Sequence, residues 1–420
     1  MPTVQWIPRN AQYRYYYRSL ERFGMKQKIK SMKLAIVALC LSLRNHRRAG
    51  TLTSNIHRRR MFSIVFSVLY MRNQITEMNH RSITVFYPSD GVAMHDAASI
   101  FWTDVSFEKM FRFRRPDFFR MLDAMNLRDK SICCSRSGRG KYFPADICFV
   151  VVLRRLAFPC RFFDMVNMFG IPSNRLCDIF HSTIDFLHTR YAKKLNEFTT
   201  WEQYFPAFAA AMLHAGAPYD NLISIFDGNC TACCRPGGLG NQNSRFDQSE
   251  VYTGEKAQHQ FKYLVSQFPN GISVLSGPYK GKVHDGRMLS ESGWTQVLMH
   301  IEHTTGRRFL MFGDAGFAVS RYIQAMYKEY GGYITADARN FNNLMSRIRI
   351  YIENSFAEKA NIFSFMSFKN GLRLGGRRVN CAYEVANFLQ NIRTTFYGNQ
   401  FCHALNYPLR ISVEEFLALA

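Results

Sequence analysis

The chain has 420 residues, of which 47% are hydrophobic and 15% aromatic, so it is long enough for two or three domains with cores of their own. Its formal net charge of +23 and its pI near 9.7 attract polyanions, chiefly nucleic acid or an anionic membrane face, and argue against a hydrolase of small substrates. The longest uncharged apolar runs, 34–43 and 61–71, fall short of the about 20 residues that a membrane-spanning helix needs.

Residues 1–100 hold much of the positive charge, with 16 Lys and Arg against 4 Asp and Glu. Basic clusters at 44–48 and 57–60 alternate with short apolar runs. This pattern favours a basic extension that is poorly ordered or loosely helical. The alternative is a basic arm that lies on DNA phosphates or serves as a nuclear import signal.

Residues 101–200 are predicted to form a helical domain. Apolar residues recur at helical spacing over 104–125, with Pro116 opening a second helix. The Ser-, Gly- and Arg-rich stretch 133–143 is predicted to be a loop.

A helix-turn-helix-like pair is predicted next. A helix over 161–169 ends at Gly170 as a left-handed cap, and Ser173 caps the following helix. Asn174 and Arg175, at the start of that second helix, are the side chains best placed to contact DNA. The alternative is an ordinary pair of helices joined by a short turn.

Residues 201–420 are predicted to form a mixed α/β domain. The apolar run at 222–226 closes on Asp227, and strands over 261–268 and 271–277 form a hairpin at Asn270-Gly271. A helical stretch over 285–303 precedes a strand that closes on Asp314, and 319–330 is predicted to be helical.

A later helical pattern carries Glu353. Its apolar stripe consists of Phe341, Met345, Ile348, Ile352 and Phe356. Asn342, Arg349 and Glu353 align along the edge of that stripe, where a polar group borders the core and still reaches a cleft. Carboxylates brought together from two strand ends and a helix are suited to hold a pair of Mg²⁺ ions. Taken singly, each acid is more typical of a turn or of a solvated helix face.

The ordered series of phrases in this half resembles the DDE-type endonuclease domain of PIF/Harbinger-like transposases. The phrases are FDGN, CRPGG, YTGEKAQHQFK, PNGISVLSGPYKGKVHDGRMLSESG, FGDAG, FNNLMSRIRIYIENSF and YEVANFLQNIRTTFYG. The resemblance extends over roughly residues 101–420 and implies an RNase H-like catalytic core preceded by a helix-turn-helix-containing domain.

The resemblance also implies a set of site residues and partners. Asp227, Asp314 and Glu353 match the family's metal-binding acids, and Asp285 beside His284 matches an auxiliary acid. Two Mg²⁺ (or Mn²⁺) ions, double-stranded DNA at transposon terminal repeats, a Myb-like partner protein and a nuclear location follow from the same resemblance. The family's basic phrase matches Lys256, His259 and Lys262, which would contact DNA or else form a solvated strand face.

The chain departs from the family pattern at four single positions and at one insertion-like stretch, 238–250. The single positions are Asn229, Glu255, Asn354 and Ala357. None of these changes removes an acid, so the expected set of acids is intact.

Eleven cysteines follow no even disulfide framework. Cys230, Cys233 and Cys234 contain one CxxC pair, but a structural zinc site needs four ligands and no second pair follows at suitable spacing. Reduced thiols in a nuclear or cytosolic protein are the better interpretation.

The sequence therefore predicts a metal-dependent DNA endonuclease or transposase that hydrolyses phosphodiester bonds at transposon ends. Arg349, four residues before Glu353, would orient that acid or contact phosphate, or else form an ordinary helix ion pair. The alternative function is a domesticated, catalytically silent DNA-binding protein. No membrane association is expected, and the oligomeric state stays open.

Overall fold

The computed structural model describes residues 4–6, 103–134, 141–236, 248–254, 256–329, 333–367, 372, 379–405 and 410–420. The predicted basic extension, apart from 4–6, lies outside the described residues, as do Glu255 and most of the insertion-like stretch. None of the helices in the described part of the chain is long and apolar enough to cross a membrane.

The N-terminal half is a largely helical unit, here called the helical unit (residues 103–195). Its helices are α5 (Asp104–Phe111), α6 (Arg115–Ala124), α7 (Ala145–Ala157), α8 (Phe162–Phe169), α9 (Ser173–Leu187), the π-helix η1 (His188–Ala192) and α10 (Lys193–Leu195). The Thr103 hydroxyl caps α5, and Pro116 lies in the first turn of α6, where a missing N–H costs no hydrogen bond. Buried aromatic side chains of α5 and α6, Phe107, Phe111 and Phe118, pack edge to face.

Two helices joined by a short turn lie where the sequence predicts a helix-turn-helix-like pair, with one correction to the caps. Helix α8 ends at Phe169, and Gly170 adopts the left-handed conformation with φ of 63°. Helix α9, however, begins at Ser173 itself, and Pro172 is the capping residue without a side-chain hydrogen bond. The prediction of Ser173 as the cap is therefore wrong by one residue.

The prediction of a loop over 133–143 is wrong at both ends, where the chain forms strands. Strand β2 (Lys130–Cys134) pairs antiparallel with β3 (Lys141–Pro144), and β1 (Val4–Trp6) pairs with β2. The reason is burial: Ser131, Ile132 and Cys134 of β2 are buried, and strand pairing satisfies the backbone groups that burial removes from water.

A connecting segment leads into the second half through the 3₁₀ helix η2 (Phe198–Tyr204) and α11 (Phe205–His214). Its aromatic residues Trp201, Phe205 and Phe208 are fully buried and surround Phe268, which lies just before the Asn270-Gly271 turn. This aromatic cluster attaches the connection to the sheet.

The second half contains a mixed sheet. Its strands are β4 (Leu222–Ala232), β5 (Tyr252–Thr253), β6 (Gln258–Gln267), β7 (Ser273–Lys280), β8 (Leu310–Gly313) and β9 (Ile323–Ala325). The order is β5-β6-β4-β8-β9, with β7 on β6. Strand β6 is antiparallel to β4 and β7, whereas β8 is parallel to β4 and to β9. The hairpin predicted at Asn270-Gly271 is confirmed, and Gly271 has φ of 84°.

Strand β4 runs past Asp227, contrary to the expectation that it closes there. Asp227 pairs with Val265 of β6, and the pairing continues to Ala232 opposite Gln260. On the other side, the pairing of β4 with β8 ends at Ile225 opposite Phe312. The outer half of β4, residues 228–232, therefore projects beyond β8, and among the described residues it pairs with a strand on one edge only.

The helix predicted over 319–330 is not formed. Residues 323–325 instead form β9, which pairs parallel with β8 in the register Met311 to Ile323 and Gly313 to Ala325. Ile323 and Ala325 are each 1% exposed, so alternate burial on the sheet outweighs the helical spacing of this short apolar stretch.

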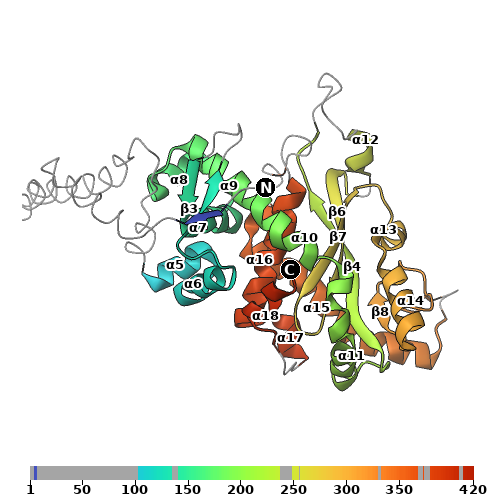
Figure 1. Cartoon of the computed structure of the whole chain (residues 1–420). Coiled ribbons are helices and arrows are strands. Elements are labelled where there is room, and N and C mark those ends of the chain that lie inside the picture. The colour runs from blue at the N-terminus through green and yellow to red at the C-terminus, as the bar shows by residue number, and fades with distance from the viewer. Residues whose placement is uncertain are drawn as a thin grey trace, which may run out of the picture.

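Helices α11, α13 (Asp285–Ser292), α15 (Ala336–Ile362) and α16 (Val379–Tyr397) pack on the sheet (Figure 1). The other helices of this half are α12 (Gln248–Val251), α14 (Trp294–Thr305), α17 (Gln400–Ala404), α18 (Val413–Ala418) and the 3₁₀ helix η3 (Ser364–Ser367). Helix α16 lies between the helical unit and the sheet and contacts both η1 and β7. The stripe predicted on α15 is confirmed, since Met345, Ile348 and Ile352 are buried.

Candidate active site

Three acidic side chains reach the same rim of the sheet from different elements. Asp227 lies inside β4, Asp314 directly follows β8, and Glu353 lies on α15. Parallel neighbours β4 and β8 bring the two aspartates close, because the carboxyl ends of parallel strands lie at one edge of a sheet. The amphipathic packing of α15 then directs its polar edge toward that rim.

The three acids meet on the guanidinium of Arg349. Arg349 Nη2 lies 3.5 Å from Asp227 Oδ2 and 3.2 Å from Glu353 Oε1. Arg349 Nη1 lies 3.5 Å from Asp314 Oδ1. The bond to Glu353 is an i,i+4 pair along α15, whereas the other two cross from the helix to the sheet. One cation thus draws together the three carboxylates that the sequence predicted as a set.

The acids differ in burial, and Asp227 is the most enclosed. Its side chain is 17% exposed, against 42% for Asp314 and 55% for Glu353. Burial raises the pKa of Asp227, while the Gly228 N–H bond to its Oδ1 and the Arg349 charge act in the opposite direction. Arg349 itself is half-buried, and its Nε has no hydrogen-bond partner within the described part of the chain.

Asp285 approaches β4 from another side. It is the first residue of α13, after His284 as cap, and its Oδ1 accepts a hydrogen bond from Lys262 Nζ at 3.2 Å. A Cβ at Gly228 would lie 3.1 Å from the Asp285 carboxylate. Because side chains alternate along a strand, Gly228 faces away from the side that Asp227 faces. Asp285 therefore pairs with Lys262 and is not one of the three acids on Arg349.

The predicted DNA-contacting residues fall into two places. Asn174 and Arg175 are in the first turn of α9; Asn174 Oδ1 accepts from Arg175 N, and Arg175 pairs with Asp178 at 3.8 Å. Lys256 is exposed before β6, and the His259 ring lies 5.3 Å from the Tyr252 ring. Lys262 is committed to Asp285 and to the Val283 carbonyl, so it acts on the candidate site rather than on a free surface.

The three acids offer the donor atoms that a divalent metal prefers. Carboxylate oxygens are the ligands that Mg²⁺ and Mn²⁺ prefer, and here three carboxylates converge on one cationic group. In this arrangement, however, no group of three or more His, Cys, Asp or Glu side chains among the described residues is spaced to hold a metal ion. The donor atoms are of the type that such an ion prefers, but their present spacing does not hold one, and the Arg349 guanidinium is the group that would have to move aside.

The cysteine cluster is placed beside this site. Cys230, Cys233 and Cys234 form no disulfide bond, and neither do the other cysteines in the described ranges. Burial raises the pKa of Cys230, with the nearby Lys262 acting in the opposite direction.

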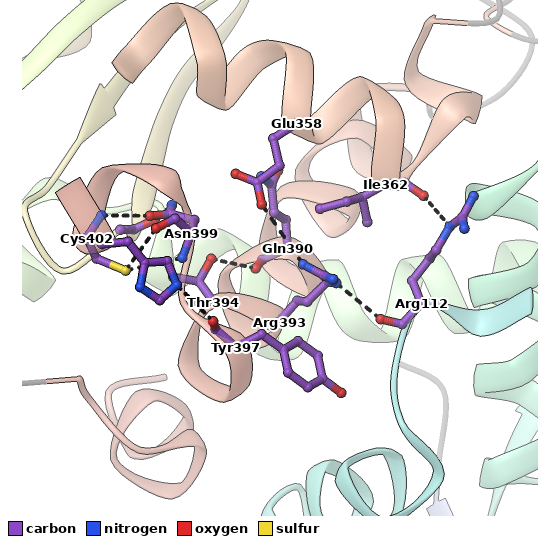
Figure 2. A network of polar contacts seen from close by, with 11 residues as sticks. Arg112, Glu358, Ile362, Gln390, Arg393, Thr394, Tyr397, Asn399 and Cys402 are labelled. Carbon is purple, nitrogen blue, oxygen red and sulfur yellow. Dashed lines mark hydrogen bonds and ion pairs between the residues drawn. The ribbon is translucent and has the colours of Figure 1, made fainter. Parts of the chain in front are cut away.

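The structure adds contacts that the sequence did not indicate. Helix α15 is fastened at its far end: Arg112 Nε donates to the Ile362 carbonyl at 3.0 Å, and Arg393 Nε donates to the Arg112 carbonyl at 3.2 Å (Figure 2). Arg393 also faces Glu358 at 4.0 Å. These bonds tie the helix that carries Arg349 and Glu353 to the helical unit. A left-handed residue such as Arg112, with φ of 67°, has no reliable sequence signal.

A second set of contacts surrounds Asn229, the position at which the chain departs from the resembled family. Asn229 Nδ2 donates to the Tyr383 hydroxyl at 2.6 Å. Tyr383 stacks on Tyr263, whose hydroxyl donates to Glu384 at 3.2 Å. Pairing between residues more than 100 positions apart leaves no local pattern, so these contacts become visible only in the fold.

Comparison with known proteins gives one match. No curated protein matches the chain, and no solved structure does. The model of one protein family, described as DDE superfamily endonuclease, matches residues 227–391, which begins at Asp227 and includes Asp314, Arg349 and Glu353. This part of the chain is thus similar to the endonucleases of the DDE superfamily, and a nuclease- or transposase-related domain is supported.

Proposed function

We propose that this protein is a metal-dependent DNA endonuclease of the transposase type, with Asp227, Asp314 and Glu353 as its acidic triad. The observation that carries the proposal is the meeting of all three carboxylates on Arg349 within the matched segment. The strand order and directions, with three antiparallel strands followed by two parallel ones, support an RNase H-like core. The charge of +23 supports a polyanionic substrate.

Asp227, Asp314 and Glu353 would hold two Mg²⁺ or Mn²⁺ ions, which when bound lower the pKa of an attacking water and stabilise the departing 3′ oxygen. The chain's own residues prepare this site. Arg349 offsets part of the negative charge of the three acids, and its guanidinium would be available to a phosphate oxygen if it moved away from them. Lys262 keeps Asp285 engaged on the other side of β4, so that Asp285 is auxiliary.

Double-stranded DNA at transposon terminal repeats is the proposed substrate. Helix α9 of the helical unit, with Asn174 and Arg175 in its exposed first turn, would lie in a DNA groove as a recognition helix does. A PIF/Harbinger-like specificity, a Myb-like partner and a nuclear location are part of the same proposal and rest on the resemblance of the sequence phrases.

One observation favours a second function, a catalytically silent DNA-binding protein of transposase origin. The Arg349 guanidinium lies among the acids, and these are not spaced as metal ligands within the described residues. If the arginine stays there permanently, the chain binds DNA without cutting it.

The experiment that separates the two functions is incubation of the full-length protein with labelled candidate terminal-repeat duplexes. The nuclease proposal expects nicking that requires Mg²⁺ or Mn²⁺ and stops with a chelator. Tight, salt-sensitive binding without cleavage on any duplex would assign the chain to the silent class. A scrambled duplex of the same length serves as the control for end recognition.

A further inference from the structure

In the described part of the chain, the outer half of β4, the strand that carries Asp227, pairs with one neighbouring strand, whereas the inner half pairs with two. Strand β4 pairs with β8 only as far as Ile225, two residues before Asp227, while its pairing with β6 continues to Ala232. Among the described residues, no strand pairs with the β8 side of residues 228–232. A strand paired on one edge is easier to displace than a central strand, and here that strand carries the most buried acid of the site.

Side chains of α16 and β6 supply support from the face of the strand. Asp227, Asn229 and Thr231 face the same side of β4, because alternate residues of a strand do so. Asn229 donates to the Tyr383 hydroxyl at 2.6 Å. The phenol oxygen of Tyr383 thus holds one residue of the projecting segment.

Tyr383 is itself held rigidly. Its ring is 2% exposed and stacks on the Tyr263 ring, with centroids 4.5 Å apart and planes inclined by 6°. Lys359 Nζ lies 5.9 Å from the centroid of the Tyr383 ring. A buried ring in such a stack has little freedom to rotate, so its hydroxyl is a fixed point for β4.

The stack continues to the helical unit. The Tyr263 hydroxyl donates to Glu384 Oε1 at 3.2 Å, and Glu384 Oε2 lies 2.8 Å from His188 Nε2. His188 is the first residue of η1, directly after α9. Helix α9, which is proposed to contact DNA, is therefore followed directly by His188, and His188 bonds the Glu384 carboxylate that accepts from Tyr263. Buried polar chains of this kind cost desolvation and fix one arrangement of the elements that they join.

We propose that Tyr383, supported by Tyr263, Glu384 and His188, is a positioning residue that fixes the projecting half of β4 through Asn229 and so sets the direction of Asp227. This inference rests on the proposed nuclease function for its catalytic consequence. Its structural part, the restraint of Gly228–Ala232, does not depend on activity.

The test compares Tyr383→Phe, Asn229→Ala and the double variant in the full chain. Tyr383→Phe removes one oxygen and leaves the ring stack intact. The matched control is Tyr279→Phe, which removes a half-buried hydroxyl of the same sheet that bonds Ser276 and the Met288 carbonyl and does not reach β4. Three quantities are measured: amide hydrogen exchange of peptides covering 227–232, Mn²⁺ affinity by calorimetry, and kcat and KM for DNA cleavage.

The proposal expects about fivefold faster exchange in 228–232 and about fivefold weaker Mn²⁺ binding in Tyr383→Phe, since one hydrogen bond is worth about 1 kcal/mol and tenfold corresponds to about 1.4 kcal/mol. We expect kcat to fall and KM for DNA to stay unchanged. Asn229→Ala should give the same effects, with no further loss in the double variant because both changes break one bond. Tyr279→Phe should leave all three quantities as in the wild type.

Unchanged exchange in 228–232 in Tyr383→Phe would overturn the positioning role, whatever the activity. A wild type that neither binds Mn²⁺ nor cleaves DNA, while exchange responds as expected, would overturn the proposed function and leave the restraint of β4 standing. A wild type that cleaves, with Tyr383→Phe cleaving equally well, would leave the nuclease intact and remove Tyr383 from its mechanism.

Discussion

Gly228 and Asp285 lie so close that a methyl group at position 228 would meet the carboxylate at 3.1 Å. The glycine does not have a positive φ, so space rather than backbone conformation requires it. This differs from the usual role of glycine after aspartate in a turn.

Gly228→Ala is expected to push Asp285 away from Lys262 and to lower cleavage by about tenfold, with a change in the free energy of unfolding below about 1 kcal/mol. The control is Gly286→Ala on the neighbouring helix, where a Cβ would meet nothing within 4 Å. Urea unfolding and nicking assays of both variants check the prediction. Equal activity of the two variants would show that the packing of Asp285 on β4 does not matter for the site.

Arg349→Gln tests the proposed competition between guanidinium and metal. Without the arginine, three carboxylates lose their common counter-charge, so a divalent cation should stabilise the variant more than the wild type. A difference of about 1 kcal/mol corresponds to a gain in Tm on adding Mg²⁺ that is larger by roughly 2–4 °C. Arg287→Gln, which breaks an exposed pair with Glu291, is the control. A smaller gain in Arg349→Gln would mean that the arginine organises the acids for metal instead of competing with it.

The stability of the protein is expected to depend on pH through His188. Hydrogen bonds to Cys381 and Glu384 raise the pKa of His188 from 6.5 to about 10. A group whose pKa is raised on folding stabilises the protein fully below its unfolded value and loses that contribution as pH rises through the folded value. The stability difference between wild type and His188→Asn should therefore be largest below pH 6.5 and disappear toward pH 10. A difference that is constant over this range, in urea titrations, would contradict the charged state of His188.

Lys359 is expected to give the opposite pH dependence, with stability that rises as pH rises. It is 3% exposed, its Nζ has no hydrogen-bond partner in the described part of the chain, and burial lowers its pKa from 10.5 to about 7. The folded state therefore binds the proton less readily than the unfolded state, and stability from this group rises with pH between these values. Lys359→Met should be more stable than the wild type at pH 7 and lose that advantage by pH 10.5. A methionine variant that is less stable at pH 7 would show that the ammonium has an unseen partner.

The sequence was most informative where a periodic pattern coincides with burial. The stripe on α15 and the hairpin at Asn270-Gly271 follow from spacing and turn chemistry alone. The sequence failed at β9, where a short apolar stretch satisfies helical and strand spacing alike and only the neighbouring β8 decides. It also could not show that β4 continues beyond Asp227, because that continuation depends on pairing with β6.

The candidate site, too, has a part that the sequence predicts and a part that only the fold shows. The three acids could be selected from ordered phrases, and Arg349 from its i,i+4 spacing to Glu353. That Arg349 also reaches Asp227 and Asp314 depends on how α15 packs on the sheet. The Asn229–Tyr383 bond joins residues 154 positions apart, and no local pattern predicts it.

The most direct test of the central claim is cleavage of a labelled terminal-repeat duplex in Mg²⁺ by the wild type and by Asp314→Asn, with DNA binding titrated in Ca²⁺. The amide keeps the size of the side chain but is a poorer ligand for Mg²⁺ than a carboxylate. We expect cleavage to fall by orders of magnitude, with DNA affinity near that of the wild type, because affinity rests on the basic surface. Glu353→Gln should behave like Asp314→Asn, and Asp285→Asn should lose less. Cleavage by Asp314→Asn at the wild-type rate would contradict the account.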